Sequence, residues 1–318
     1  MKKTIFVLGA NPAWQKTLHF SELRPGEVNR AARMSSYPAG KGVNFCRAAT
    51  GFGVAETLLF QFAGGMEGER LRAGLEREGI RHETVVTAAE TRCCVTCLDR
   101  ETGKMTELIE PSGRVSEEEA DELLRRLAAK IPAASLFAIA GSLPDGADLS
   151  LYEKAASIAV AAGIPVLADA VKGIAPVLDL PGRIILKVNR GEFLAITGCN
   201  GLEEAHRCAA KRWPFAGFAV TAGPDRATFA DRGRGCIYTL PRLDRIVSPL
   251  GAGDTASAVL ASGLLAGTDP AEAFRSALAA ASANCLTERA GEFKREDWSS
   301  LLPQVRMEPF RFTGRDAS

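Results

Sequence analysis

The sequence lacks a long apolar run, an excess of charge of one sign and any internal repeat. Its 318 residues carry 39 Lys and Arg against 38 Asp and Glu, a formal net charge of +1. Without a basic excess there is no general electrostatic case for binding nucleic acid or a membrane surface. No stretch approaches the roughly 20 apolar residues of a membrane span, and the apolar part of residues 1–9 is too short for a signal peptide. We therefore expect a cytoplasmic protein.

Closely spaced cysteines are also scarce. Of the eight Cys residues, only Cys94 and Cys97 have a spacing typical of metal or redox sites. They lie in the β-rich segment 93–98, where residues three apart are expected to point to opposite faces of a strand. No second pair lies nearby to complete a zinc site, so buried free thiols are the better interpretation.

What is present is a regular alternation of strand and helix patterns. From residue 116 onward, helices are expected at 116–130 and 150–162, and strands at 135–140, 165–169, 183–188 and 217–221. This alternation predicts a mostly parallel sheet covered by helices. Such sheets bind ligands at the carboxyl ends of their strands. Polar side chains collect at these ends, namely Asn11, Ser142, Asp169, Asn189 and Glu192.

The first half adds parts of the same sheet and a second, smaller one. A strand is expected at 5–8 and another at 58–62, with helices at 45–53 and 69–78. Short β-rich segments predict a separate small sheet. These are 18–36, 85–86, 92–99 and 106–109. The helix at 116–130 opens with the capping box Ser116 to Glu119, and the tail from Met307 is expected to fray.

The stretch at 247–256, Val-Ser-Pro-Leu-Gly-Ala-Gly-Asp-Thr-Ala, carries the chemistry. Glycines on both sides of Ala252 allow a sharp turn with bare amide groups, and a buried helix is expected from 256 to 266. Bare amides and the positive end of a helix favour an anion. A carboxylate beside such a site suits phosphoryl transfer, in which Asp254 takes the proton of an attacking hydroxyl.

Two other interpretations of glycine-rich stretches stay open. Gly251, Gly253 and Ala256 also fit a relaxed dinucleotide fingerprint or a purely structural turn. A dinucleotide site needs a βαβαβ unit downstream, for which too little chain follows. A second stretch, Gly-Lys-Gly-Val-Asn at 40–44, offers donors to a polyhydroxyl or anionic ligand, or is an ordinary helix entry. It is not a Walker loop, because Gly follows Lys41.

The motifs at 40–44 and 251–254 resemble the two signatures of the ribokinase/PfkB carbohydrate kinases, over about residues 4–302. Further motifs follow the order of the 1-phosphofructokinase and tagatose-6-phosphate kinase branch: Asn-Pro-Ala at 11–13, Gly-Glu-Val-Asn-Arg at 26–30, Thr-Arg at 91–92, Glu-Pro at 110–111, Gly-Ser-Leu-Pro at 141–144 and Asn-x-x-Glu at 189–192. The resemblance implies one kinase domain over 1–318, with a mainly parallel sheet, helices on both faces and a small β-sheet lid. The lid segments would be about 12–36 and 84–110, and such lids often form a dimer clasp.

The resemblance also implies ATP, Mg²⁺ and a role for individual residues. Asp254 would be the catalytic base, and the backbone of Gly251, Ala252 and Gly253 the anion hole. The sugar side would comprise Gln15, Gly40, Lys41, Asn44, Arg92 and Ser142. The nucleotide side would comprise Lys187, Asn189, Glu192, Thr221, Gly223 and Asn284, with Asn189 and Glu192 organising Mg²⁺ through water. Taken one at a time, three of these residues also have purely structural interpretations: Glu192 as a helix cap, Arg92 as a solvated strand residue and Lys187 as a snorkelling side chain.

Several positions depart from the pattern of the branch. Gln15 stands where Asp is usual, Ala39 where Gly is usual, and Val188 where Pro is usual, while Ser-Pro at 248–249 replaces Asp-Thr. The predicted function is ATP-dependent phosphorylation of a sugar-phosphate hydroxyl, with fructose 1-phosphate, fructose 6-phosphate or tagatose 6-phosphate as acceptor. A kinase of a different sugar or nucleoside, a non-catalytic sugar or nucleotide sensor and, more remotely, a dinucleotide oxidoreductase are the alternatives.

Overall fold

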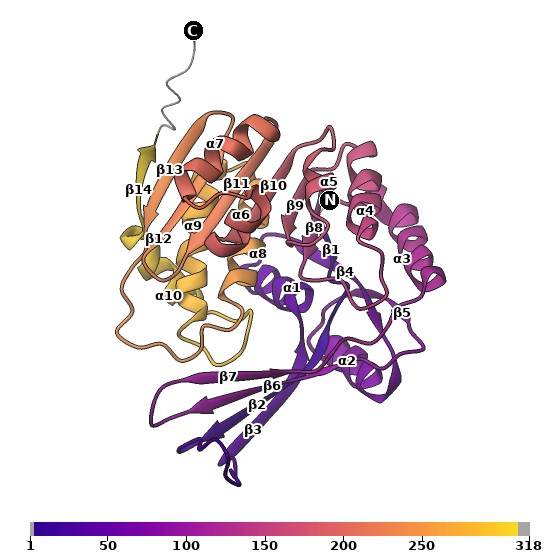
Figure 1. The fold of residues 1–318 in the computed structure, drawn as a ribbon, viewed down its shortest axis with the longest axis vertical. Coiled ribbons are helices and arrows are strands. Elements are labelled where there is room, and N and C mark those ends of the chain that lie inside the picture. Colours follow the sequence, from indigo (N-terminus) through magenta and orange to yellow (C-terminus); the bar gives the residue numbers. More distant parts are fainter. Residues whose placement is uncertain (1–2, 311–318) are drawn as a thin grey trace.

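The computed structural model describes residues 3–310 and is built around a ten-stranded sheet in the order β14-β13-β12-β11-β10-β9-β8-β1-β4-β5 (Figure 1). The strands from β5 to β11 pair in parallel, and β12, β13 and β14 extend the sheet as an antiparallel meander. The bounds are β1 (Thr4–Leu8), β4 (Glu56–Ala63), β5 (His82–Val86), β8 (Leu136–Ala140), β9 (Val166–Asp169), β10 (Ile184–Asn189), β11 (Ala216–Ala222), β12 (Arg226–Asp231), β13 (Arg234–Thr239) and β14 (Arg306–Phe310).

Helices cover both faces of this sheet, so its central strands are buried on both sides. In β1, Ile5 and Val7 join one hydrophobic cluster while Phe6 and Leu8 join the other. One layer comprises α1 (Lys41–Phe52), α8 (Ala252–Ala266), α9 (Pro270–Asn284) and α10 (Arg295–Leu301), followed by η2 (Leu302–Gln304). The other comprises α3 (Glu117–Lys130), η1 (Ile131–Ala133), α4 (Ser150–Ala161), α5 (Ala175–Leu178), α6 (Arg190–Thr197) and α7 (Leu202–Arg212). Burial on both faces explains why these strands are continuous apolar runs.

A four-stranded sheet in the order β3-β2-β6-β7 projects from the body, at the foot of Figure 1. Its strands are β2 (Ala13–Phe20), β3 (Arg33–Ala39), β6 (Cys93–Asp99) and β7 (Met105–Ile109). We call it the small sheet. Helix α2 (Gly65–Arg77) packs between the small sheet and the body, where Gly74 closely approaches Pro38 and Trp14. The ribokinase-like arrangement expected from the sequence, a mainly parallel sheet with a small separate sheet, is confirmed.

Three local predictions are wrong. The segment 85–86 is not in the small sheet, because β5 pairs in parallel with β4 and buries Val85 in the main core. Helices α1, α2 and α8 each begin four residues earlier than expected, since each starts directly after a glycine. The tail does not fray at Met307, because β14 pairs with β13. The rest of the tail lies outside the described residues.

The capping box predicted at the start of α3 is confirmed, because Ser116 and Glu119 each accept a hydrogen bond from the backbone amide of the other. All eight cysteines are free thiols, and on β6 the buried Cys97 alternates with the partly exposed Cys94. Between residues 3 and 310 no group of three or more potential ligands is placed to hold a metal ion. None of the helices in that range has the length and apolar character to cross a membrane.

Candidate active site

Asp254 lies in the first turn of α8, and its side chain is buried. Its Oδ2 accepts a hydrogen bond of 2.8 Å from Nδ2 of Asn44 on α1. Burial raises the pKa of Asp254, and the nearby carboxylate of Asp169 raises it further, against the opposing effects of Lys41 and Asn44. A carboxylate whose charged form is destabilised in this way is a stronger base than an exposed one.

The turn before α8 depends on Gly251. This residue caps the helix with φ +81°, in the left-handed region, and a Cβ there would lie 2.7 Å from Ala290. The amide of Ala252 donates to the carbonyl of Pro249 at 3.3 Å, and Thr255 is the first residue to donate back into the helix, to the Gly251 carbonyl at 2.8 Å. Helix geometry then leaves the amides of Gly253 and Asp254 pointing out of the helix N-terminus. Of the three residues expected to form the anion hole, Ala252 therefore has its amide engaged in the turn, while Gly253 has its amide among those that helix geometry leaves open.

Gly253 serves a different purpose from the sharp turn expected of it. It lies within α8, and a Cβ at this position would lie 3.0 Å from the ammonium nitrogen of Lys187. The missing side chain makes room for Lys187 beside the helix N-terminus. The sequence prediction that both glycines are needed for backbone freedom is thus correct for Gly251 only.

Asp169, at the end of β9, binds two lysines. Its Oδ1 accepts from Lys41 and its Oδ2 from Lys187, both at 2.9 Å, and Ser257 donates to Oδ2 at 2.7 Å. Burial alone would raise the pKa of Asp169, but the ammonium groups of Lys187 and Lys41 outweigh burial and hold it well below the ordinary value. Burial lowers the pKa of Lys41, but Asp169 and Asp254 more than offset this and raise it.

The two ammonium groups face two carboxylates, Asp169 and Asp254, so the cluster carries no net positive charge when both are ionised. The ammonium group of Lys187 nevertheless lies beside the open amides of α8, and these donors suit an anionic ligand. The sequence marks Asp169 only as a polar residue at a strand end and predicts no role for it. Its position at the end of the apolar strand 165–169 is the one sequence signal.

Asn189 and Glu192 form a capping box at the start of α6. Oδ1 of Asn189 accepts from the amide of Glu192, and Oε2 of Glu192 accepts from the amide of Asn189, each at 2.9 Å. The helix-cap interpretation of Glu192 is therefore realised. Glu192 also contributes to the raised pKa of Lys41, after the larger effects of burial and of Asp169 and Asp254. Thr221 and Gly223 lie at the end of the neighbouring strand β11, where Gly223 is exposed.

Asn284, expected on the nucleotide side, is fully buried in the protein. Its Oδ1 accepts from the Thr255 hydroxyl and from the amide of Gly291, both at 2.9 Å. Its Nδ2 donates to the carbonyl of Leu250 at 2.9 Å. The side chain therefore holds the turn before α8 through hydrogen bonds inside the protein, which corrects the expectation of a nucleotide contact.

The residues expected to bind sugar lie where the small sheet meets the body. Nε2 of Gln15 donates to Oγ1 of Thr96 at 2.8 Å and to the carbonyl of Lys16 at 3.0 Å, which fixes the orientation of its amide. In this buried position Gln15 has its carbonyl oxygen as the remaining polar atom.

Arg92, Asn11 and Ser142 form a linked group. Nη2 of Arg92 donates to the Asn11 carbonyl at 3.2 Å, and Nδ2 of Asn11 donates to the Ser142 hydroxyl at 3.2 Å. Nε of Arg92 is buried and has no hydrogen-bond partner among the described residues. Gly40, with φ +107°, caps α1, and a Cβ there would lie 2.8 Å from Pro12. Its conformation brings α1, with Lys41 and Asn44, close to the end of β1.

The parallel sheet, the small sheet beside it and the glycine-capped start of α8 together define a ribokinase-like protein. A model of the pfkB family of carbohydrate kinases matches residues 4–297. The chain belongs to this family and is a sugar kinase, and kinases of this family use ATP.

Solved structures agree with this fold. Phosphofructokinase-2 from Escherichia coli in complex with fructose-6-phosphate superposes with a TM-score of 0.84 at 23% identity, covering 96% of this chain and 99% of that one. A possible 1-phosphofructokinase from Thermotoga maritima gives 0.84 at 18% identity, covering 97% and 100%. Ribokinase from Arabidopsis thaliana complexed with ribose and ATP gives 0.72 at 20% identity, covering 95% and 99%.

Proposed function

We propose that this sugar kinase transfers the γ-phosphoryl group of ATP to a hydroxyl of a ketohexose phosphate, such as fructose 1-phosphate, fructose 6-phosphate or tagatose 6-phosphate. The observation that carries the proposal is the position of Asp254, a buried carboxylate at the N-terminus of α8 beside open amides and a pair of lysines. This arrangement combines a base with groups that stabilise negative charge, and phosphoryl transfer needs both.

In the proposed reaction, Asp254 takes the proton of the acceptor hydroxyl. The hydroxyl oxygen bonds to the γ-phosphorus while the bond from that phosphorus to the β,γ-bridging oxygen breaks, and ADP leaves. The amides of Gly253 and Asp254, with Lys187, would stabilise the charge on the transferred group. The turn held by Gly251 and Ala252 sets the direction of these donors.

The residues on the nucleotide side suit Mg²⁺. Asn189 and Glu192 offer hard oxygen ligands at the end of β10: Glu192 uses one of its two carboxylate oxygens in the helix cap, and the single side-chain oxygen of Asn189 accepts one cap hydrogen bond and keeps its second lone pair. Mg²⁺ keeps much of its water shell and needs few protein ligands, so this pair fits a contact through water. When bound, Mg²⁺ supplies neutralising charge for the nucleotide phosphates. Thr221 and Gly223 would line the nucleotide, and Asn284 would support the site by holding the turn.

Arg92 would bind the phosphate of the acceptor. Its unpaired Nε and forked guanidinium suit a phosphate group. Gly40, Lys41, Asn44 and Ser142 would line the sugar, with Gln15 accepting one hydroxyl hydrogen bond. Gln15 also favours a second candidate, a kinase of a different sugar or of a nucleoside, because a neutral amide selects hydroxyl groups differently from a carboxylate.

We also propose that the small sheet forms a homodimer contact. Met34 on β3 and Leu108 on β7 are each 58% exposed. The strand register places both on the same face of the small sheet, because Met34 aligns with Leu18, Cys97 and Thr106 across the strands. Thr106 and Leu108 are two residues apart on one strand and so share a face.

A panel of free and phosphorylated sugars and nucleosides, assayed for ADP release with Mg·ATP, tests the catalytic proposal. A ketohexose phosphate is expected to give the highest kcat/KM.

Asp254→Asn is expected to lower kcat by about 10²- to 10⁴-fold while ATP still binds. Asp121→Asn, which removes an exposed carboxylate on α3, is the matched control. A near-normal rate in D254N would refute the assigned base, preference for an unphosphorylated acceptor would favour the second candidate, and ATP binding without turnover would favour a sensor.

A further inference from the structure

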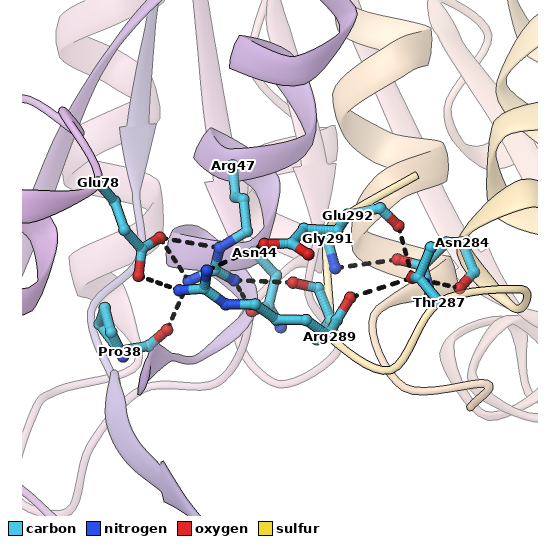
Figure 2. Close-up of polar contacts among 10 residues, drawn as sticks. Pro38, Asn44, Arg47, Glu78, Asn284, Thr287, Arg289, Gly291 and Glu292 are labelled. Carbon is cyan, nitrogen blue, oxygen red and sulfur yellow. Dashed lines mark hydrogen bonds and ion pairs between the residues drawn. The ribbon is translucent and has the colours of Figure 1, made fainter. Parts of the chain in front are cut away.

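The side chain of Arg47, one turn after Asn44 on α1, is buried and bonds to Asn44 and to three other segments (Figure 2). Its Nη1 donates to Oδ1 of Asn44 at 3.1 Å and to the carbonyl of Ala290 at 2.7 Å. Its Nη2 donates to the carbonyl of Pro38 at 2.6 Å, and its Nε to Oε2 of Glu78 at 2.9 Å. The guanidinium therefore joins α1 to strand β3 of the small sheet, to the end of α2 and to the loop after α9.

The contact with Asn44 fixes the direction of an amide group. Asn44 has one acceptor end and one donor end: Oδ1 faces Arg47, and Nδ2 faces Asp254. If the amide were reversed, its oxygen would face the carboxylate and its NH₂ group would face the guanidinium. Both new contacts would be repulsive, so Arg47 selects the orientation in which Asn44 donates to Asp254.

We propose that Arg47 is a positioning residue for the phosphoryl-transfer step: through Asn44 it orients Asp254, and through the Pro38 carbonyl it couples that orientation to the small sheet. The proposal rests on the proposed role of Asp254 as the base. Because Pro38 belongs to β3, a displacement of the small sheet would move one hydrogen-bond partner of the guanidinium that holds Asn44.

Arg289 provides a matched comparison in the same network. It pairs with the same carboxylate, Glu78, and its guanidinium lies 4.8 Å from the ring centroid of Tyr37, where that of Arg47 lies at 5.6 Å. Its other ion pair is with Glu292 rather than with an active-site group. The two arginines thus share surroundings and charge, but Arg47 alone of the two donates to Asn44 in the part of the chain that the structure describes.

The test compares Arg47→Lys with Arg289→Lys on the best acceptor of the panel. R47K keeps the positive charge next to Glu78 but loses the fork that reaches Asn44 and Pro38 together. We expect R47K to lower kcat by about 10- to 100-fold with little change in the KM for ATP, and R289K to stay within about twofold of the wild type. In an Asn44→Ala background, R47K is expected to add little further loss, because the two residues act as a unit.

The pH profile of kcat separates positioning from general damage. The charged groups around Asp254 are Asp169, Lys41 and Lys187, and those around Arg47 are Glu78, Arg289 and Glu292. R47K leaves all of these charges in place. The change that remains is a weaker hydrogen bond from Asn44 to Asp254, which raises the pKa of Asp254. The acid limb of the profile should therefore move to higher pH. An unmoved acid limb with normal kcat, an equal loss in R289K, or additive losses in N44A would each overturn the proposal.

Two measurements keep the test decisive. If R47K fails to fold, the double variant R47M/E78M removes both charges of this ion pair, so neither position keeps an unpaired ion. Its kcat and the pH profile of kcat are then measured as for R47K. If the wild-type protein phosphorylates nothing in the panel, the proposed function fails by itself. Arg47 is then tested by infrared titration of Asp254, identified by difference from D254N. R47K should raise the pKa of Asp254, and an unchanged pKa would overturn the proposal.

Discussion

Nδ2 of Asn44 donates a 2.8 Å hydrogen bond to Oδ2 of Asp254, although the two residues are 210 positions apart in the chain. The bond joins the first turns of α1 and α8, two helices that both start after a glycine with positive φ. An oriented amide donor next to a carboxylate stabilises its charged form without neutralising it. This contact suits the proposed role of Asp254 as the base.

The acid limb of the pH profile of kcat should lie above the ordinary range for an aspartate. Asp254 must be ionised to act as a base, and its pKa is raised by burial and by Asp169. Activity should therefore fall with decreasing pH before the value of about 3.9 that an unperturbed Asp has. Steady-state kinetics across the stable pH range measure this, and Asn44→Ala should move the limb higher still. An acid limb at or below the pKa of an unperturbed Asp would show that burial and Asp169 do not raise the pKa of Asp254.

Asp254→Asn should stabilise the protein at pH 7 although it lowers kcat. A carboxyl group whose pKa is raised by folding favours the folded state when protonated, below its unfolded pKa, and this contribution is lost as pH rises through the folded pKa. Removing the charge should raise Tm by a few degrees, since about 1 kcal/mol moves Tm by roughly 2 °C in a large domain. Thermal unfolding at pH 7 and at low pH measures this, and the gain should shrink at low pH. A lower Tm for D254N at pH 7 would contradict the prediction.

Asp169→Asn should destabilise the protein, because Lys187 is buried and would lose its partner. Removing one member of a buried ion pair costs about 3–5 kcal/mol, which urea unfolding at pH 7 would detect. The pKa of Asp169 is lowered in the folded state, so its contribution is present above the unfolded pKa and is lost as pH falls. The difference between D169N and the wild type should therefore diminish in acid. The double variant D169N/K187M should recover part of the loss, and no recovery would argue against a simple pair.

Alanine at the two glycines of the catalytic turn should give different defects. Gly251→Ala forces a positive φ and places Cβ against Ala290, so it should cost about 1–3 kcal/mol in unfolding free energy and lower kcat. Gly253→Ala has ordinary helical backbone, and its Cβ would meet only the end of the flexible Lys187 side chain. We expect it to fold normally and to raise the KM for ATP. Equal stability losses in the two variants would show that the distinction is wrong.

Charge placed on the exposed face of the small sheet should disrupt the proposed dimer. Met34→Lys and Leu108→Lys replace apolar side chains that are 58% exposed in the single chain. Light scattering after gel filtration should show a dimer for the wild type and a monomer for the double variant. Leu149→Lys, a change at a 54% exposed site outside the small sheet, is the control. A wild-type monomer, or a double variant that stays dimeric, would contradict the proposal.

Much of the fold could be predicted because its signals are local. Alternating strand and helix patterns indicated the parallel sheet, and Ser116 with Glu119 marked the start of α3. The starts of α1 and α8 were missed because a glycine cap carries no side-chain signal of the kind that Ser or Asp provides. Segment 85–86 was assigned to the wrong sheet because a short β-rich pattern does not say which strand it pairs with.

For the candidate site, the sequence indicates which residues to consider but not the contacts that they make. Asp254 was expected next to an anion hole, and the structure places it in the first turn of α8. The pairing of Asp169 with two lysines depends on three segments that only the folded sheet brings together. Asn284 was misjudged because a helix position indicates which face a residue occupies, not whether its amide binds a ligand or braces a neighbouring turn.

The sheet order has a consequence for biosynthesis. Strand β1, made first, is sandwiched between β4 and β8, and the turn that carries Asp254 closes onto α1 only after some 200 further residues have left the ribosome. Under the proposed mechanism the growing chain lacks its base until that point. Chains that stop before Asp254 are therefore expected to have no phosphotransferase activity.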